Sequence, residues 1–256
     1  MIKPERQRSD PTSMQQVICP LSIVPVRKEA SDRSEMISQW LYGETADVLE
    51  RREKWSVLKF HHDGYEGWVD NKQMQEHGPA DRIPPVRVTD LCAQVATSGG
   101  AMHLAFGAVL TPALSSSYTG ATSAQLSGST FERIATVMDR WLNAPYLWGG
   151  RTPMGVDCSG LSQMLFGVSG VPLPRDAWQQ AEKGMSIPSI DDALPGDLAF
   201  FDNEQGRIVH VGIVLPGNKI LHASGRVRID ALDRNGINDQ QEGRRTHQLR
   251  SLRRAG

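Results

Sequence analysis

Residues 145–161 constrain the fold more than any other stretch of this sequence. Proline and glycine interrupt the chain repeatedly up to Asp157, and the pattern changes directly after it. From Cys158 on, apolar residues recur at the spacing of one helix face, at Leu161, Met164, Leu165 and Val168. We therefore expect a glycine-rich loop that ends in a short helix, which begins at Asp157 or Cys158 and ends near Gly167.

A cysteine at the start of a helix is suited to nucleophilic catalysis. Cys158 would face the unpaired N–H groups of the first turn and the positive end of the helix dipole. Both favour the thiolate over the thiol. The alternative is that Cys158 is a small buried apolar residue. A nucleophile also needs a base, so the positions of the histidines decide between these interpretations.

Helical patterns precede strand patterns in the C-terminal half. Ser129 and Glu132 match a capping box, and the apolar spacing predicts an amphipathic helix over 130–143 that ends before Pro145. Another helix is predicted at 175–183. The pattern then alternates, which predicts strands at 198–201, 207–215, 219–223 and 226–231. This order indicates an α+β domain with helices packed on an antiparallel sheet.

The loop between two predicted strands decides whether two histidines meet. His210 shares a strand face with Gly212. If 216–218 form the loop, Gly212 opposes His222, and the imidazoles are diagonal neighbours, about 7–8 Å apart at the backbone. A two-residue loop would place them on opposite faces. In the first register, Cys158, His210 and His222 can act as nucleophile, base and the group that orients the base.

The same three side chains allow other interpretations. Each histidine could be an ordinary core or surface residue with satisfied hydrogen bonds. Cysteine and histidine are also zinc ligands, so a zinc hydrolase is an alternative, although we expect neither a metal nor a cofactor. Inhibition by iodoacetamide together with indifference to chelators would favour thiol chemistry.

The N-terminal half consists of short strand patterns separated by turns. Those between residues 16 and 78 predict a small β-barrel, with strands near 17–21, 24–26, 45–49, 55–60 and 65–69. A proline-containing linker follows, and the short runs up to residue 126 suggest a second, diverged barrel. The expected organisation is a flexible N-terminus (1–15), a first barrel domain (16–78), a second (79–127) and the α+β domain (128–256).

Charge and cysteine content bear on partners and compartment. The net charge is -1, and we expect neither nucleic acid nor a membrane as a partner. Cys19, Cys92 and Cys158 show no disulfide or metal spacing, which fits a reducing compartment. No signal-peptide pattern is present, so we expect a cytoplasmic protein, or a periplasmic or secreted one if a signal was removed. The arginines of 244–254 are interpreted as a solvated basic end.

The motifs of the C-terminal half together resemble the NlpC/P60 cysteine peptidases, which have a papain-like core. The likeness covers about residues 128–232 and rests on five motifs in order: Tyr146-x-Trp148-Gly-Gly150, Asp157-Cys158-Ser159-Gly160, Pro195-Gly-Asp197, His210-Val-Gly212-Ile213 and His222-Ala-Ser224. Segments 34–44 and 64–69 resemble bacterial SH3-like domains that accompany such peptidases. The whole chain is similar to γ-D-glutamyl-L-diamino-acid endopeptidases, which hydrolyse murein peptides after L-Ala-γ-D-Glu.

The resemblance implies a role for each site residue. The nucleophile, base and orienting group fall on Cys158, His210 and His222, and the oxyanion tyrosine falls on Tyr146. A second set closes the cleft around the free amine of the substrate's L-Ala, and its members are Glu35, Tyr65 and Asp176. The residues implied on the D-Glu side are Trp148, Asp157 and Ser159.

One departure and three competing functions remain. Some relatives carry a serine where Ala177 stands, so one substrate hydrogen bond is in doubt. The expected partner is a murein peptide, L-Ala-γ-D-Glu-diamino acid, cleaved during peptidoglycan peptide recycling. The alternatives are a non-catalytic module that binds murein fragments, a wall-remodelling hydrolase acting on intact peptidoglycan, and an acyltransferase on the same core.

Overall fold

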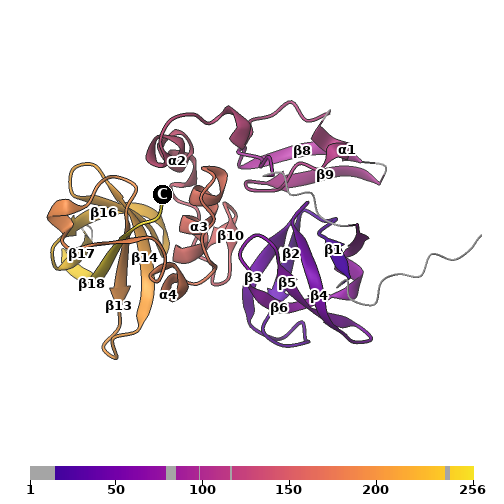
Figure 1. The fold of residues 1–256 in the computed structure, drawn as a ribbon, viewed down its shortest axis with the longest axis horizontal. Coiled ribbons are helices and arrows are strands. Elements are labelled where there is room, and N and C mark those ends of the chain that lie inside the picture. The colour runs from indigo at the N-terminus through magenta and orange to yellow at the C-terminus, as the bar shows by residue number, and fades with distance from the viewer. Residues whose placement is uncertain (1–14, 79–84, 98, 116, 240–242) are drawn as a thin grey trace, which may run out of the picture.

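The computed structural model describes residues 15–78, 85–97, 99–115, 117–239 and 243–256. Figure 1 shows three parts: an N-terminal domain, a small middle segment (residues 85–126) and a C-terminal domain whose helices lie between its own sheet and the N-terminal domain. The predicted flexible N-terminus, residues 1–15, falls outside the described residues except for Gln15.

The N-terminal domain is one seven-stranded antiparallel sheet coiled around a small core. Its strand order is β3-β2-β6-β5-β4-β1-β7. The core is built from alternating strand positions that point inward, with Trp40 and Phe60 as its largest members. The strands are β1 (Gln16–Ile18), β2 (Ile23–Arg27), β3 (Met36–Leu41), β4 (Thr45–Arg51), β5 (Trp55–Phe60), β6 (Glu66–Asp70) and β7 (Gln75–His77).

The described residues of the middle segment show fewer strands than the second barrel that the sequence suggested. Its described residues contain a single two-stranded sheet, β8 (Cys92–Thr97) with β9 (Gly100–Ala105), and the short helix α1 (Pro112–Ser115). Its core is small, with Val88, Val95, Leu104, Ala108 and Leu114. So few inward-facing apolar residues leave little to hold further strands around a closed core.

The C-terminal domain begins with helices and ends in a sheet. Its helices are α2 (Thr130–Met138), α3 (Cys158–Val168) and α4 (Ala177–Gln180). The capping box at Ser129 is confirmed, because its N–H donates to Glu132 (2.7 Å) and its Oγ accepts from the Glu132 N–H (3.3 Å). α3 has the predicted bounds, but α2 and α4 are shorter than predicted: a 3-10 turn, Asp139–Trp141, continues α2, and α4 covers only the centre of 175–183.

All four predicted strands are present in the C-terminal sheet: β13 (Leu198–Asp202), β14 (Ile208–Leu215), β15 (Lys219–Ser224) and β16 (Arg226–Asp233). The seven-stranded order is β12-β18-β13-β14-β15-β16-β17, and β17 also pairs with β18. Both faces of β14 are apolar because both are covered. Val211 and Ile213 pack in the core shared with the helices, whereas Val214 lies in a second core on the other face.

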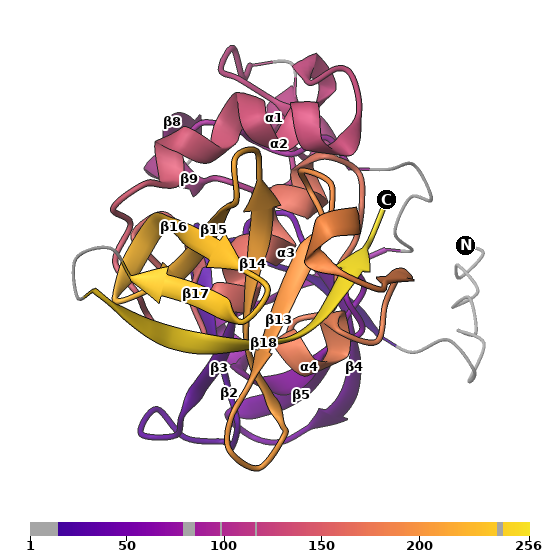
Figure 2. The ribbon, with the colours of Figure 1, turned by 90° about the vertical axis from the view of Figure 1, so that its left-hand side faces the viewer.

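The prediction of a solvated basic end is wrong. Residues 244–254 form β18 (Arg244–Arg254), which pairs with β12 (Met185–Ile187), β13 and β17 (Gly236–Asp239) and runs across the sheet in Figure 2. Leu252 is buried, and Arg254 forms an ion pair with Asp197 (2.7 Å). No helix among the described residues is long and apolar enough to cross a membrane.

Candidate active site

Cys158 is the first residue of α3, and the preceding loop is held by the residue that caps this helix. Asp157 has extended backbone, and its Oδ1 accepts from the Gly160 N–H (2.7 Å). Its Oδ2 accepts from the Gly149 N–H (2.9 Å). Gly149 has a φ of 77° and lies against the Met36 carbonyl of the N-terminal domain, so a side chain there would be strained and would clash. The loop is thereby fixed on both sides of the cysteine.

The position of Cys158 does not activate its thiol in the way that the sequence suggested. Burial raises the pKa of this thiol to about 12, and the negative charge of Asp157 adds to the shift. Backbone N–H groups of Val211 and Ser159 oppose it, as expected at a helix start, but burial outweighs them. The thiol is therefore protonated, and its deprotonation requires a base.

The two histidines meet as the three-residue loop predicted. Leu215 pairs with Lys219 and Gly212 with His222, so His210 and His222 are diagonal neighbours on adjacent strands. His210 Nε2 and His222 Nδ1 lie 2.9 Å apart, with the rings at 85° to each other. A Cβ at Gly212 would lie 2.6 Å from the Ile220 Cδ1 and 3.0 Å from the His222 Cβ, so glycine leaves room here for the side chains of β15.

His210 is neutral at ordinary pH. Burial lowers its pKa well below the usual value, and neighbouring His222 and His247 lower it further. Among the described residues no hydrogen bond joins Cys158 to His210; instead, the thiol lies beside the N–H of Val211, the next residue along β14. Catalytic hydrogen bonds are often long before substrate binds. The structure thus places a neutral thiol beside the strand that carries a neutral imidazole.

The structure adds two residues to the histidine pair that sequence reasoning missed. His247 of β18 stacks on His210, with ring centroids 4.2 Å apart and planes at 25°. Burial lowers the pKa of His247 to about 4, so the stacked ring is also neutral. Asp230 of β16 lies 2.9 Å from His222 Nε2 through its Oδ2. Strand alternation places Asp230 diagonally from His222, a signal that the sequence contained, but His247 depended on recognising β18.

Tyr146 lies close to the thiol. Its N–H donates to the Gly225 carbonyl (3.0 Å), and its backbone bridges Val156, two residues before Cys158. Burial raises the pKa of Tyr146 to about 12, and the negative charge of Asp157 adds to the shift. The phenol is therefore a protonated hydrogen-bond donor, and it remains 37% exposed to solvent.

Two contacts between the N-terminal and C-terminal domains bring together the residues implied at the amine end of the cleft. The Tyr65 hydroxyl donates to Asp176, at 3.4 Å from Oδ1 and 3.3 Å from Oδ2. The Trp148 Nε1–H donates to Glu35 Oε1 (2.7 Å), and Lys28 pairs with the other Glu35 oxygen (3.2 Å). Residues more than a hundred positions apart in the sequence thus meet at one edge of the C-terminal domain.

Asp157 and Ser159 are buried, and Arg175 engages both of them. The Arg175 guanidinium donates to both oxygens of Asp157, at 3.0 and 2.6 Å, and to the Ser159 Oγ at 3.0 Å. It also donates to Ser38 of the N-terminal domain (3.1 Å). Sequence reasoning missed Arg175, although it directly precedes Asp176. The Asp157 carboxylate thus fixes the loop, and its oxygens already have partners within the protein.

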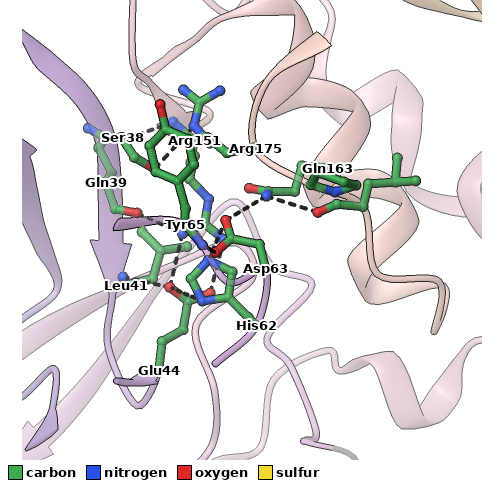
Figure 3. Close-up of polar contacts among 12 residues, drawn as sticks. Ser38, Gln39, Leu41, Glu44, His62, Asp63, Tyr65, Arg151, Gln163 and Arg175 are labelled. Atoms are coloured by element: carbon green, nitrogen blue, oxygen red, sulfur yellow. Dashed lines mark hydrogen bonds and ion pairs between the residues drawn. The ribbon is translucent and has the colours of Figure 1, made fainter. Parts of the chain in front are cut away.

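A buried cluster, here called the interdomain ion cluster, joins the three parts of the chain (Figure 3). Its members are Glu44, His62, Asp63, Arg87 and Arg151. Arg151 donates twice to Glu44, at 2.9 and 3.0 Å, and Arg87 of the middle segment donates once, at 3.1 Å. Burial opposes ionisation of Glu44, but Arg151, His62 and Arg87 hold its pKa well below the usual range.

The interdomain ion cluster also contacts Tyr65 and helix α3. Asp63 Oδ2 accepts from Gln163 of α3 (2.9 Å), and Asp63 Oδ1 accepts from the Tyr65 N–H (2.9 Å). Burial would raise the pKa of Asp63, but His62 and its other partners lower it to about 2. Asp63 therefore links the position of Tyr65 to the helix that begins at Cys158, as Figure 3 shows.

The zinc interpretation has no support in this geometry. One nitrogen each of His210 and His222 is used in their contact with each other. Within the described ranges, no group of three or more His, Cys, Asp or Glu side chains is arranged to hold a metal ion.

Sequence comparison identifies two domains of known families. The NlpC/P60 family profile matches residues 143–246, and the profile of the bacterial dipeptidyl-peptidase SH3 domain matches residues 26–74. A gamma-D-glutamyl-L-lysine dipeptidyl-peptidase of Bacillus subtilis (strain 168) is 30% identical over 212 residues, which are 73% of this chain and 71% of the relative. A protein of the same name from Bacillus cereus (strain ATCC 10987 / NRS 248) is 24% identical, over 85% of this chain and 77% of the relative.

Solved structures show the same fold along nearly the whole chain. An NlpC/P60 family protein from Bacillus cereus ATCC 10987 superposes with a TM-score of 0.74, at 17% identity, over 94% of this chain and 99% of that one. An NlpC/P60 endopeptidase from Photobacterium damselae subsp. piscicida gives a TM-score of 0.66, at 17% identity, over 93% of this chain and 70% of that one.

Proposed function

Because this chain belongs to the NlpC/P60 family and is a cysteine peptidase with an N-terminal SH3-like domain, we propose that it hydrolyses the bond between γ-D-Glu and the L-diamino acid of murein peptides that carry a free N-terminal L-Ala. Relatives named gamma-D-glutamyl-L-lysine dipeptidyl-peptidases support the peptide class. Such a substrate arises when murein has already been degraded, so we further propose that the protein serves peptide recycling in the cytoplasm.

The observation that carries this proposal is the contact of Tyr65 with Asp176 across the two domains. Burial raises the pKa of Asp176, and its hydrogen-bond partners include the Tyr65 hydroxyl. A desolvated carboxylate gains most from a cation, and the ammonium of an N-terminal L-Ala supplies one. Glu35, which already accepts from Trp148 and pairs with Lys28, is the second carboxylate of this scheme. An N-acetylated or glycan-linked peptide would bring no positive charge to the Asp176 carboxylate.

The chemistry follows from the neutral resting pair. His210 takes the proton of Cys158 as the sulfur attacks the γ-carbonyl carbon of D-Glu. The Cys158 N–H and the Tyr146 hydroxyl donate to the oxygen as it becomes negative. The intermediate then expels the diamino acid's nitrogen, which receives the proton from His210. Water, deprotonated by His210, hydrolyses the thioester and regenerates the thiol.

The test compares two substrates by mass spectrometry of their products. L-Ala-γ-D-Glu-diaminopimelate-D-Ala and its N-acetylated form are incubated with wild type, Cys158→Ala and the matched control Cys92→Ala, which alters an exposed cysteine far from the site. We expect L-Ala-D-Glu from the free-amine peptide only, made by wild type and Cys92→Ala and lost in Cys158→Ala.

Each other outcome has a defined meaning. Equal cleavage of the acetylated peptide would contradict the proposed amine site of Glu35, Tyr65 and Asp176, but it would still support the peptidase activity. Release of peptides from intact murein at a comparable rate would favour wall remodelling over recycling. Binding of both peptides without cleavage by wild type would show a binding module instead.

A further inference from the structure

A line of polar contacts continues behind the catalytic histidines across three neighbouring strands. It runs from His210 on β14 to His222 on β15 and on to Asp230 on β16, with 2.9 Å at each step. The register supports it, because Ile220 pairs with Asp230, which makes Asp230 the diagonal neighbour of His222. His222 is 1% exposed and Asp230 5% exposed, so water competes little for either contact.

We propose that Asp230, held in place by Arg228, is a positioning residue that fixes which ring nitrogens of His222 and His210 carry protons. An ionised carboxylate only accepts hydrogen bonds. His222 must therefore carry its proton on Nε2, which leaves a lone pair on Nδ1. His210 must then donate from its own Nε2, and its Nδ1 is left as the lone pair that can take the thiol proton.

Asp230 is itself held by charged partners. Arg228 Nη2 donates to Asp230 Oδ1 (2.9 Å), Arg228 Nε lies 2.9 Å from Oδ2, and the same guanidinium reaches Asp239 (2.8 Å). Burial would raise the pKa of Asp230, but His222 and Arg228 together lower it, so the carboxylate stays ionised at neutral pH. The Asp230 carboxylate, which accepts from His222, is thus fixed in both position and charge.

The arrangement also acts during the reaction, and this step rests on the proposed function. When His210 takes the thiol proton it becomes an imidazolium, whose Nε2–H donates to His222. His222 passes the polarisation to the Asp230 carboxylate, which stabilises the positive charge across one intervening ring. Without Asp230, His222 could adopt the opposite tautomer, and His210 would then hold its proton on the nitrogen needed as base.

The test reads the ring nitrogens directly. Full-length protein with ¹⁵N-labelled histidine is examined by long-range ¹H–¹⁵N spectra, which distinguish protonated from unprotonated ring nitrogens; signals are assigned with His210→Ala and His222→Ala. In wild type we expect Nε2–H for both residues. In Asp230→Ala we expect the Nδ1–H form of His222 to appear, and in Asp230→Asn, which still offers an oxygen, we expect the wild-type form to be kept.

Kinetics on the free-amine peptide give the second readout. The loss of a hydrogen bond to a charged group corresponds to about 10–100-fold in rate, so we expect kcat of Asp230→Ala to fall by that factor at unchanged KM, with partial rescue in Asp230→Asn. Asp191→Ala, the same change at an exposed carboxylate of the C-terminal domain, is the matched control. We expect its histidine signals and kcat to be those of wild type.

The outcomes separate this inference from the proposed function. A wild-type His222 protonated on Nδ1 overturns the inference without any variant, as does an Asp230→Ala protein with unchanged ring signals and kcat. A wild type that does not cleave the peptide contradicts the proposed function, while the ring spectra still decide the tautomers.

Discussion

Replacement of Glu44 by glutamine should destabilise the junction of all three parts of the chain. Glu44 is 2% exposed, and its carboxylate accepts two hydrogen bonds from Arg151 and one from Arg87. A glutamine would turn one acceptor into a donor that faces a guanidinium, and Arg151 would stay buried with part of its charge unpaired. Breaking a buried ion pair on one side costs about 3–5 kcal/mol, a large share of the roughly 5–15 kcal/mol of a whole domain.

The assay is urea unfolding, with hydrogen exchange to locate the effect. The matched control is Glu50→Gln on β4, the strand that begins directly after Glu44; it breaks an exposed pair with Arg52 (2.6 Å) and should cost less than about 1 kcal/mol. We expect a lower midpoint for Glu44→Gln only, with faster exchange in β4 and in residues 149–157. Equal midpoints for the two variants would refute the argument that desolvation makes the Glu44 contacts decisive.

The pH dependence of this difference has a defined sign. The pKa of Glu44 is lower in the folded than in the unfolded state, so its contribution is present above the unfolded pKa and is lost as the pH falls toward the folded one. Glutamine does not titrate. The stability gap between wild type and Glu44→Gln should therefore shrink as the pH is lowered from 7 toward 3, and a gap that grows would contradict the assignment.

Three further predictions address the site and its support. Gly212→Ala should lower kcat and cost about 1–3 kcal/mol, because the new Cβ would lie 2.6 Å from the Ile220 Cδ1 and 3.0 Å from the His222 Cβ; wild-type kinetics would show that Ile220 moves aside without displacing His222. Ser129→Ala should cost about 0.5–2 kcal/mol in urea unfolding by loss of the capping box, with kcat unchanged. Iodoacetamide labelling of Cys158 should accelerate from pH 6 to 10 without a plateau, because burial raises its pKa to about 12; a plateau near pH 6 would indicate a preformed thiolate.

The sequence was informative where local chemistry decides the structure. The loop before Lys219 could be predicted because Gly217 and Asn218 adopt positive φ, at 75° and 56°, which these residue types tolerate. That loop sets the register of His222, and the start of α3 followed from its apolar spacing. The catalytic roles assigned to these residues stay predictions until variants are measured.

The rest depends on contacts between distant segments. The Arg151–Glu44 pair joins residues 107 positions apart, and no local pattern selects it among the other charges. Burial sets the pKa of Cys158 more than its position at the helix start does. Only the helix start could be predicted from the sequence. Strand β18 was missed because its many arginines are typical of a solvent-exposed segment. Among its described residues, Leu252 is the only fully buried apolar one, so the apolar pattern of a strand is weak there.

The charges of this site are arranged so that the reacting pair is neutral while its surroundings are ionised. Asp157 with Arg175 holds the loop through a buried ion pair, and Asp230 with Arg228 holds the histidines through a pair whose carboxylate is buried and whose guanidinium is partly exposed. Cys158 and His210 lie between them with their pKa values shifted toward the uncharged forms. Charge separation then has to occur during the reaction, where the fixed Asp230 and the oxyanion donors stabilise it most. On this argument, loss of Asp230 should slow the chemical step more than it weakens substrate binding.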